Sequence, residues 1–315
     1  IRPYNPGQEA GVLSIQPIPY QGSKRAIADL ILQYFPDGIA TLYEPFVGSG
    51  AVSITAAYYH RAAFFHLNDI NAPLIELWRD IIERPADLAA RYDQLWQAQL
   101  GNERQFFDQV RDEFNSTHQT HHFLYLLARG VKGAVRYNTQ GKFNQSPDNR
   151  RLGRWPESMR ADIVEVSRHF SDRVALSSVD YRQILPLAGP ADLVYMDPPY
   201  QGVCTGRDSR YYKSVEREEF AAELRKLTDR GISYLVSYDG RLGNKTYGEP
   251  IPSTAGVHRI EIAVGRSSQA TLLGKRDITY ESLYLSYPLM ERLGLTIHDL
   301  GDAIATAKMA QLSLF

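Results

Sequence analysis

Apolar residues recur along the chain with two periods, one typical of amphipathic helices and one of buried strands. Ile27, Leu30, Ile31 and Tyr34 follow the helical spacing, so we expect a helix over 24–35. The same spacing recurs around 74–81 and through 86–130, where no strand-like alternation is found. Short apolar runs predict strands at 41–44, 64–67, 174–177, 193–196, 232–237, 260–264 and 280–285.

The order of these segments predicts the fold class. Strands that alternate with helices favour an α/β fold with a doubly wound, mainly parallel sheet and an antiparallel edge. The helical stretch of 86–130 interrupts this alternation and predicts a helical insertion in the sheet domain. Residues 130–156 are rich in Asn, Gly, Gln and Arg, which is typical of a long functional loop.

The composition is that of an ordinary globular protein, with 315 residues, 43% hydrophobic and 23% charged. No apolar stretch approaches the ~20 residues that cross a bilayer, and the polar start has no secretory signal pattern. The single Cys204 excludes an intrachain disulfide and favours a cytoplasmic location. His118, His121 and His122 lack acidic or cysteine partners at ligand spacing, so no metal site is predicted.

The most informative tetrapeptide is Asp197-Pro198-Pro199-Tyr200, which directly follows the strand predicted at 193–196. Ligands of open α/β sheets bind at the carboxyl ends of the strands. Proline stiffens the backbone and offers a carbonyl acceptor without an N–H of its own. We therefore expect the Asp197 carboxylate and the Pro198 carbonyl to accept the two protons of a base amino group, while Tyr200 stacks on the base. The alternative is a Pro-Pro turn that closes a buried strand.

Such acceptors suit methylation of an exocyclic amine. The lone pair of that nitrogen is delocalised into the base, and acceptors on both protons favour a tetrahedral nitrogen that attacks a sulfonium methyl. A base stacked inside a duplex cannot reach the pocket, so the target base must be flipped out or already unpaired.

A second group of residues indicates a nucleoside-binding pocket. The predicted strand at 41–44 leads into a glycine turn at 45–50 and a helix at 51–60. Gly48 and Gly50 allow close approach of a ligand, but the third glycine of the dinucleotide fingerprint is missing. Asp69 stands about 20 residues further on, as expected for an acid that binds ribose hydroxyls. A ribose without phosphates suits S-adenosylmethionine, although Asn71 could simply cap the next helix.

Five segments in order make the chain resemble the Dam-type, alpha-group adenine-N6 DNA methyltransferases. They are 19–24, 44–50, 68–71, 136–144 and 197–200. The resemblance implies a catalytic S-adenosylmethionine-binding domain of 1–83 and 172–290, an inserted helical target-recognition domain of 84–171, and a C-terminal helix and tail of 291–315. It also implies that the methyl donor is bound by Tyr20, Gly22, Lys24, Glu44, Phe46, Gly48, Gly50, Asp69 and Asp180.

Two departures from the family pattern concern sequence recognition. Members that read GATC carry a lysine where this chain has Pro19, and an aromatic residue within the stretch that is Val131-Lys132-Gly133-Ala134 here. GATC specificity therefore does not follow from the resemblance. Arg136 remains available for a bidentate contact to guanine.

The distribution of charge predicts a nucleic acid as the partner, and the resemblance implies that this partner is duplex DNA. The whole chain has a net charge of −1, but 129–160 holds eight basic residues against two acidic ones. A solvated charged face is the alternative. Residues 201–213, directly after the tetrapeptide, are basic and aromatic and predict a lid, the alternative being an exposed loop without a special role. The candidate DNA-binding residues are Lys132, Arg136, Asn138, Lys142, Arg150, Arg151, Arg207 and Arg210.

The end of the chain suggests a second partner. Gln311-Leu312-Ser313-Leu314-Phe315 resembles the short motif that docks bacterial replication and repair proteins on the sliding clamp, and it follows a helix expected at 302–310. The resemblance implies that Leu312, Leu314 and Phe315 fill an apolar groove while Gln311 makes polar contacts. Packing of these side chains on their own domain is the alternative.

The function hypothesis is a site-specific DNA adenine-N6 methyltransferase that acts on a flipped adenine in duplex DNA with S-adenosylmethionine as donor. An RNA base methyltransferase and a binding-only protein recruited by the clamp are the alternatives, and cytosine-N4 transfer is a further one. We expect a monomer or weak dimer, associated with the nucleoid in the cytoplasm, with no membrane partner. The recognised sequence and a paired restriction enzyme are left open.

Overall fold

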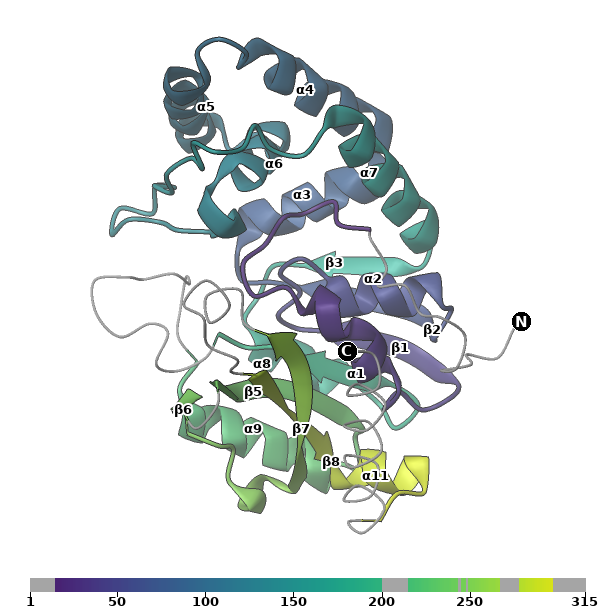
Figure 1. The fold of residues 1–315 in the computed structure, drawn as a ribbon. Coiled ribbons are helices and arrows are strands. Elements are labelled where there is room, and N and C mark those ends of the chain that lie inside the picture. Colours follow the sequence, from purple (N-terminus) through teal and green to yellow (C-terminus); the bar gives the residue numbers. More distant parts are fainter. Residues whose placement is uncertain (1–14, 200–214, 243–244, 248, 267–277, 297–315) are drawn as a thin grey trace.

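A mixed, eight-stranded sheet forms the centre of the computed structural model, which describes residues 15–199, 215–242, 245–247, 249–266 and 278–296 (Figure 1). The strand order is β3-β2-β1-β4-β5-β8-β7, and β6 pairs with β5. The strands are β1 (Ile39–Glu44), β2 (Ala62–Asn68), β3 (Val174–Ser177), β4 (Leu193–Met196), β5 (Tyr234–Leu242), β6 (Lys245–Tyr247), β7 (Val257–Arg266) and β8 (Ile278–Ser286).

The pairing confirms the predicted doubly wound, mainly parallel sheet. Strands β3, β2, β1, β4 and β5 pair in parallel, whereas β8 is antiparallel to both β5 and β7. Strand β8 is therefore second from the β7 edge, and β6 is also antiparallel to β5. Because the parallel strands run in one direction, their carboxyl ends meet along one side of the sheet.

Helices cover both faces of the sheet. One apolar cluster joins one face to η1 (Lys24–Ile27), α1 (Ala28–Leu32), α2 (Ala51–Tyr58) and α11 (Tyr287–Leu293). A second cluster joins the other face to α8 (Tyr181–Ile184), η3 (Leu185–Leu187), α9 (Arg217–Asp229) and η4 (Ser253–Ala255). The molecule is thus a three-layer α/β/α sandwich.

Five helices gather beyond one end of the sheet (Figure 1). They are α3 (Ala72–Glu83), α4 (Pro85–Ala98), α5 (Glu103–Thr117), α6 (Thr120–Arg129) and α7 (Pro156–Phe170), with η2 (Val131–Gly133) after α6. Their apolar faces belong to the same cluster as α1 and α2, so the core is continuous across the predicted boundary at 83/84. The domain division stays a prediction, and the predicted boundary at 290/291 falls inside α11.

Some helices differ from those that the apolar spacing predicts. The helix expected over 24–35 starts as a 3-10 turn and ends at Leu32. Helix α9 was not predicted, although Phe220, Leu224 and Leu227 recur at helical spacing and are buried. The helix expected at 302–310 lies outside the described residues. No helix within the described ranges combines the length and the apolar character that a membrane span requires.

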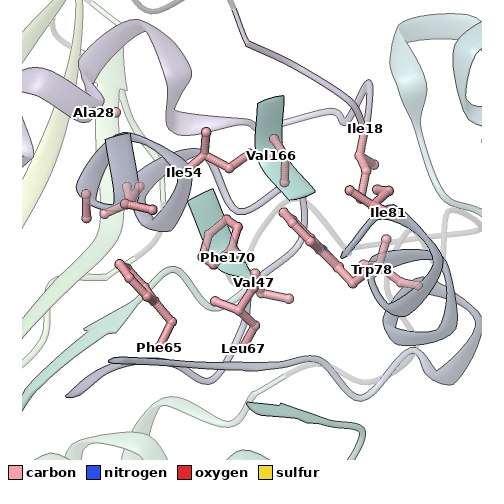
Figure 2. Packing of buried hydrophobic residues seen from close by; sticks show 14 of the residues in the cluster. Ile18, Ala28, Val47, Ile54, Phe65, Leu67, Trp78, Ile81, Val166 and Phe170 are labelled. Atoms are coloured by element: carbon pink, nitrogen blue, oxygen red, sulfur yellow. The ribbon is translucent and has the colours of Figure 1, made fainter. Parts of the chain in front are cut away.

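Trp78 of α3 connects the core to the first glycine turn (Figure 2). Its ring packs edge-on against Phe170, which in turn packs edge-on against Phe65 of β2, with centroid separations of 6.0 and 5.1 Å. The indole Nε1 donates a hydrogen bond of 3.0 Å to the Gly48 carbonyl. A fully buried tryptophan therefore holds the backbone of the turn between β1 and α2.

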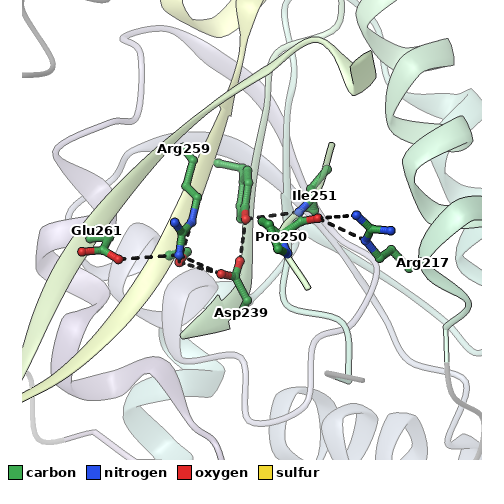
Figure 3. A network of polar contacts seen from close by, with 8 residues as sticks. Arg217, Asp239, Pro250, Ile251, Arg259 and Glu261 are labelled. Carbon is green, nitrogen blue, oxygen red and sulfur yellow. Dashed lines mark hydrogen bonds and ion pairs between the residues drawn. The ribbon is translucent and has the colours of Figure 1, made fainter. Parts of the chain in front are cut away.

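A buried polar network fixes β5, β7 and β8 relative to one another (Figure 3). The carboxylate of Asp239 accepts hydrogen bonds from Arg259 at 2.9 Å, Ser282 at 3.1 Å and Tyr284 at 2.6 Å. The Tyr284 hydroxyl also accepts from the Ile251 amide at 3.2 Å. Because a buried carboxylate without partners is costly, these contacts strongly favour one position of β8 in the sheet.

We predict that Gly50→Ala destabilises the fold by roughly 3 kcal/mol, because it combines backbone strain with overpacking. Gly50 has a φ of 62°, and a Cβ there would lie 2.5 Å from the buried Trp78 ring. Gly38→Ala is the matched control, since Gly38 has a φ of 67° but no atom within 4 Å of such a Cβ. Chemical denaturation should show a loss of only about 1 kcal/mol for the control. Equal losses in the two variants would contradict the packing role of Gly50.

Candidate active site

Four neighbouring strands deliver the predicted chemical groups to one edge of the sheet. Gly48 follows β1, Asp69 follows β2, Asp180 follows β3, and Asp197 follows β4. All four line one pocket, as does Glu44, the last residue of β1. The other predicted residues in its lining are Tyr20, Gly22, Lys24, Phe46, Pro198 and Pro199.

Two predicted residues are not among those described in the lining of this pocket. Gly50 does not line it, because it sits beneath the turn with no room for a side chain between itself and Trp78. Close packing against Trp78 accounts for a glycine at this position. Tyr200 lies outside the described residues, together with the predicted lid of 201–213 and the C-terminal pentapeptide of 311–315.

The glycine turn is held by hydrogen bonds on both sides of Gly48. Its amide donates to Asp69 Oδ2 at 3.1 Å, and its carbonyl accepts from Trp78. Gly48 has a φ of 47°, and a Cβ there would lie 3.2 Å from the Tyr20 ring. A glycine is therefore required both by the left-handed backbone and by the close approach of Tyr20.

Asn68 is a buried residue whose role the motif did not reveal. Its side-chain nitrogen donates to the Pro45 carbonyl at 2.9 Å and to the Val179 carbonyl at 3.0 Å. Its oxygen accepts from the Ser177 hydroxyl at 2.8 Å and from the Val179 amide at 3.1 Å. Asn68 thus joins the segments that follow β1, β2 and β3, and positions the loop that carries Asp180.

The pocket carboxyl groups repel one another in a region of low solvent access. Burial raises the pKa of Glu44 to about 8; the Ser53 hydrogen bond opposes this rise, while the charges of Asp197 and Asp69 add to it. Burial also raises the pKa of Asp69 to about 6, against the lowering effect of hydrogen bonds from the Asn71 and Gly48 amides. Near neutral pH, Glu44 is therefore mostly protonated and Asp69 mostly charged.

Lys24 lies beside the strand-end carboxylate. Its Nζ is 2.9 Å from Asp197 Oδ1, and its side chain is only 6% exposed. Asp180 instead pairs with Arg182 at 2.8 Å and caps α8 by accepting the Arg182 amide. The lining thus combines six carboxyl groups with two cationic ones. The carboxyl groups are Glu44, Asp69, Asp180, Asp197, Glu216 and Glu219, and the cations are Lys24 and Arg182.

The segment after α6 forms a further wall of the pocket. Val135 and Tyr137 line it, and the Tyr137 hydroxyl donates to Asn71 Oδ1 at 3.1 Å. The Gln21 amide donates to the Gly133 carbonyl at 3.1 Å, which ties the same segment to the loop before η1. No pattern in the sequence predicted that Tyr137 faces the pocket.

A hairpin-like turn presents several of the candidate DNA-binding residues. Tyr137 and Phe143 form an antiparallel bridge, and the Asn138 side chain accepts from the Lys142 amide at 2.9 Å. Asn138 therefore shapes the turn. Asn115 of α5 clamps the Phe143 backbone through two hydrogen bonds of 2.7 and 3.0 Å. Lys132 and Lys142 are exposed, and Arg136 is partly buried.

Several basic residues of 129–160 form hydrogen bonds or ion pairs within the chain. Arg129 is 2% exposed and donates to the Asp148 carbonyl at 3.0 Å. Arg154 pairs with the buried Asp162 at 2.6 Å, and the exposed Arg150 pairs with Asp148 at 3.1 Å. The net charge of 129–160 therefore overstates the charge offered to a partner. Arg151 is exposed, whereas Arg207 and Arg210 lie outside the described residues.

The doubly wound sheet, the acidic pocket and the Asp-Pro-Pro segment at a strand end agree with the expected class of base methyltransferases. The model of one family, described as D12 class N6 adenine-specific DNA methyltransferase, matches residues 20–264. The chain belongs to this family and is a DNA adenine-N6 methyltransferase by class.

Three relatives show how far the similarity extends. The DNA N-6-adenine-methyltransferase of Escherichia phage P1 is 30% identical over 70% of this chain, and the chain spans 29% of that protein. The retron Ec67 DNA adenine methylase of Escherichia coli is 29% identical, with coverage of 69% of this chain and 75% of the relative. The DNA adenine methylase of Escherichia coli strain K12 is 28% identical, with coverage of 72% and 82%.

We predict that Glu44→Gln makes the ligand-free protein more resistant to heat at pH 9. Because the folded pKa of about 8 exceeds the usual 4.5, the folded state holds a proton that the unfolded chain loses, and the free energy of unfolding falls as pH rises from about 4.5 to 8. Gln keeps an acceptor for Ser53 but cannot ionise. Thermal unfolding at pH 5 and pH 9 should show a steeper loss for the wild type, and parallel curves would contradict the burial of this charge.

Proposed function

We propose that this chain transfers a methyl group to N6 of an adenine in duplex DNA, with S-adenosylmethionine as the methyl donor. The observation that carries the proposal is the single pocket lined by Gly48, Asp69 and Asp180 together with Asp197 and Pro198. A nucleoside site and a pair of amine acceptors share this one cavity. Methyl transfer requires both in direct reach of each other.

The lining supports a positively charged nucleoside as ligand. Carboxyl groups outnumber cations around the cavity, and the charges of Asp197 and Asp69 add to the rise that burial causes in the pKa of Glu44. Asp69 would accept the ribose hydroxyls, and Phe46 and Tyr20 would pack against apolar parts of the ligand. Bound S-adenosylmethionine supplies an electrophilic methyl group on a sulfonium.

Asp197 and Pro198 make the adenine amino group a better nucleophile. The Asp197 carboxylate and the Pro198 carbonyl each accept one N–H of the adenine amino group, which concentrates the lone pair on N6. The rigid backbone of Pro198 and Pro199 holds both acceptors in place. When N6 forms its bond to the methyl carbon, the bond from that carbon to the sulfonium sulfur would break and leave a neutral thioether, and the surplus proton would leave the nitrogen toward the acceptors or solvent. Tyr200 would stack on the flipped base.

The turn of 137–143 is the proposed element for reading sequence. Asn115 and Tyr137 fix its base against the helices and the pocket, so its exposed tip is placed beside the site of chemistry. We assign phosphate contacts to Lys132, Lys142, Arg150 and Arg151, and a base contact to Arg136. The absence of the GATC-associated lysine and aromatic residue favours a different recognition sequence.

The remaining partner expectations stay predictions. The pentapeptide of Gln311 to Phe315 lies outside the described residues, so its docking on a sliding clamp rests on its sequence alone. A purified clamp that binds the full chain and its deletion of 311–315 equally well would exclude that role. From the sequence we also expect a monomer or weak dimer that is associated with the nucleoid in the cytoplasm.

We predict that Asp197→Ala lowers the rate of methyl transfer to duplex DNA roughly 10³-fold, because one acceptor of the amino group is lost. The assay uses labelled S-adenosylmethionine with duplex DNA and, in parallel, with structured RNA. Asp112→Ala, on the exposed face of α5, is the matched control and should retain full activity. Transfer to RNA alone, or undiminished activity of the Asp197 variant, would overturn the proposal.

We predict that Arg136→Ala and Lys142→Ala have different effects on DNA recognition. Loss of a base contact should cost about 1–3 kcal/mol of discrimination at one position, so Arg136→Ala should relax the methylated sequence. Loss of a phosphate contact should weaken binding to all sequences alike and reduce the salt slope by about 1, as expected for Lys142→Ala. Base-resolved sequencing of DNA from expressing cells, with binding assays at several salt concentrations, separates the two outcomes.

A further inference from the structure

Lys24 lies between two carboxylates that come from distant parts of the chain. Its Nζ is 2.9 Å from Asp197 Oδ1 at the end of β4 and 3.4 Å from Glu281 Oε2 on β8. The three side chains are 6%, 21% and 24% exposed, so the group is largely shielded from water. The sequence pattern connected Lys24 with the methyl donor and assigned no role to Glu281.

An ammonium group this deeply placed requires negative partners, because removal of a charge from water costs several kcal/mol per ion. Asp197 satisfies the charge, and the Gly22 carbonyl accepts a hydrogen bond of 3.4 Å from Nζ. Glu281 of β8 adds a second carboxylate. Because two carboxylates pair with one ammonium, both help to set the position of Nζ. The Lys24 ammonium in turn orients the Asp197 carboxylate.

Strand β8 places Glu281 rigidly. Its backbone pairs with Gly240 on one side and Ile262 on the other, so it sits inside the sheet and not at an edge. Ser282 and Tyr284, which alternate with it along the strand, bond to the buried Asp239 on the opposite face. The network around Asp239 therefore fixes the strand from which Glu281 reaches Lys24.

We propose that Glu281 is a positioning residue for methyl transfer, which orients the Lys24 ammonium and through it the Asp197 carboxylate. The inference rests on the proposed role of Asp197 as acceptor of the adenine amino group. Glu281 is not in the lining of the pocket, so it acts without contact to substrate or donor. Its effect is on the orientation and charge of the groups that make that contact.

The charges around Asp197 lead us to expect a change in the pH dependence of the rate when Glu281 or Lys24 is replaced. Among the described residues, the titratable groups that act on Asp197 include Lys24 of η1, Glu44 of β1, Tyr195 of β4 and, beyond Lys24, Glu281 of β8. Removal of the Glu281 charge leaves Lys24 to act on Asp197 alone, which favours the ionised carboxylate. Removal of the Lys24 charge has the opposite effect. The two variants should move the acidic limb of the rate profile in opposite directions.

The test compares Glu281→Gln, Lys24→Met and the double variant as full chains, with kcat, both KM values and the pH profile of each. Glu281→Gln should lower kcat about tenfold, or ~1.4 kcal/mol, with little change in either KM. Its acidic limb should move to lower pH, and that of Lys24→Met to higher pH. In the Lys24→Met background, the second substitution should lower kcat no further. Glu291→Gln, an exposed carboxylate of α11, is the control that should leave activity unchanged.

Several results would overturn the proposal. An unchanged kcat and pH profile in Glu281→Gln, or a further tenfold loss when it is added to Lys24→Met, would show that Glu281 does not act through Lys24. Thermal unfolding of each variant identifies a loss of activity that is caused by misfolding. Glu281→Asp keeps the charge on a shorter side chain and should retain the wild-type pH profile if the proposal is right. Full activity of Asp197→Ala would instead refute the proposed function itself.

Discussion

The gathering of carboxyl groups at one sheet edge is the constraint on which the rest of the site depends. Parallel strands end on the same side, so Glu44, Asp69, Asp180 and Asp197 meet in one partly closed cavity. Burial is the main cause of the raised pKa values of Glu44 and Asp69, and for Glu44 the charges of Asp197 and Asp69 raise the pKa further. Lys24 offsets part of the excess negative charge, and a cationic ligand is favoured because it offsets more.

Rigid supports surround this charged edge. Trp78 and Asp69 hold the Gly48 peptide from both sides, and Asn68 joins the loops after three strands. On the far side of the sheet centre, Asp239 fixes β8. Such groups are buried and fully bonded, so the proposed acceptors stand on elements that resist displacement. This is the condition for precise orientation of a reacting amine.

The helical part of the chain contributes to the pocket as well as to the proposed DNA contact. Tyr137 bonds to Asn71 beside Asp69, and the neighbouring Phe143 packs into the helices, so one short turn spans both regions. Arg129 and Arg154, which looked like DNA-binding residues by charge alone, instead stabilise the base of this segment. Charge counts in a sequence cannot separate such internal pairs from exposed ones.

The sequence by itself determined the strands β1 to β4, the parallel order of the sheet and most of the pocket. Local periodicity sets secondary structure, and the rule that parallel strands share a carboxyl edge then brings Gly48, Asp69 and Asp197 together. Only the tertiary structure decided which groups meet across long separations. Glu281 reaches Lys24, Tyr137 faces the pocket, and Gly50 packs on Trp78. These contacts depend on strand register and side-chain packing between distant segments, which no local pattern encodes.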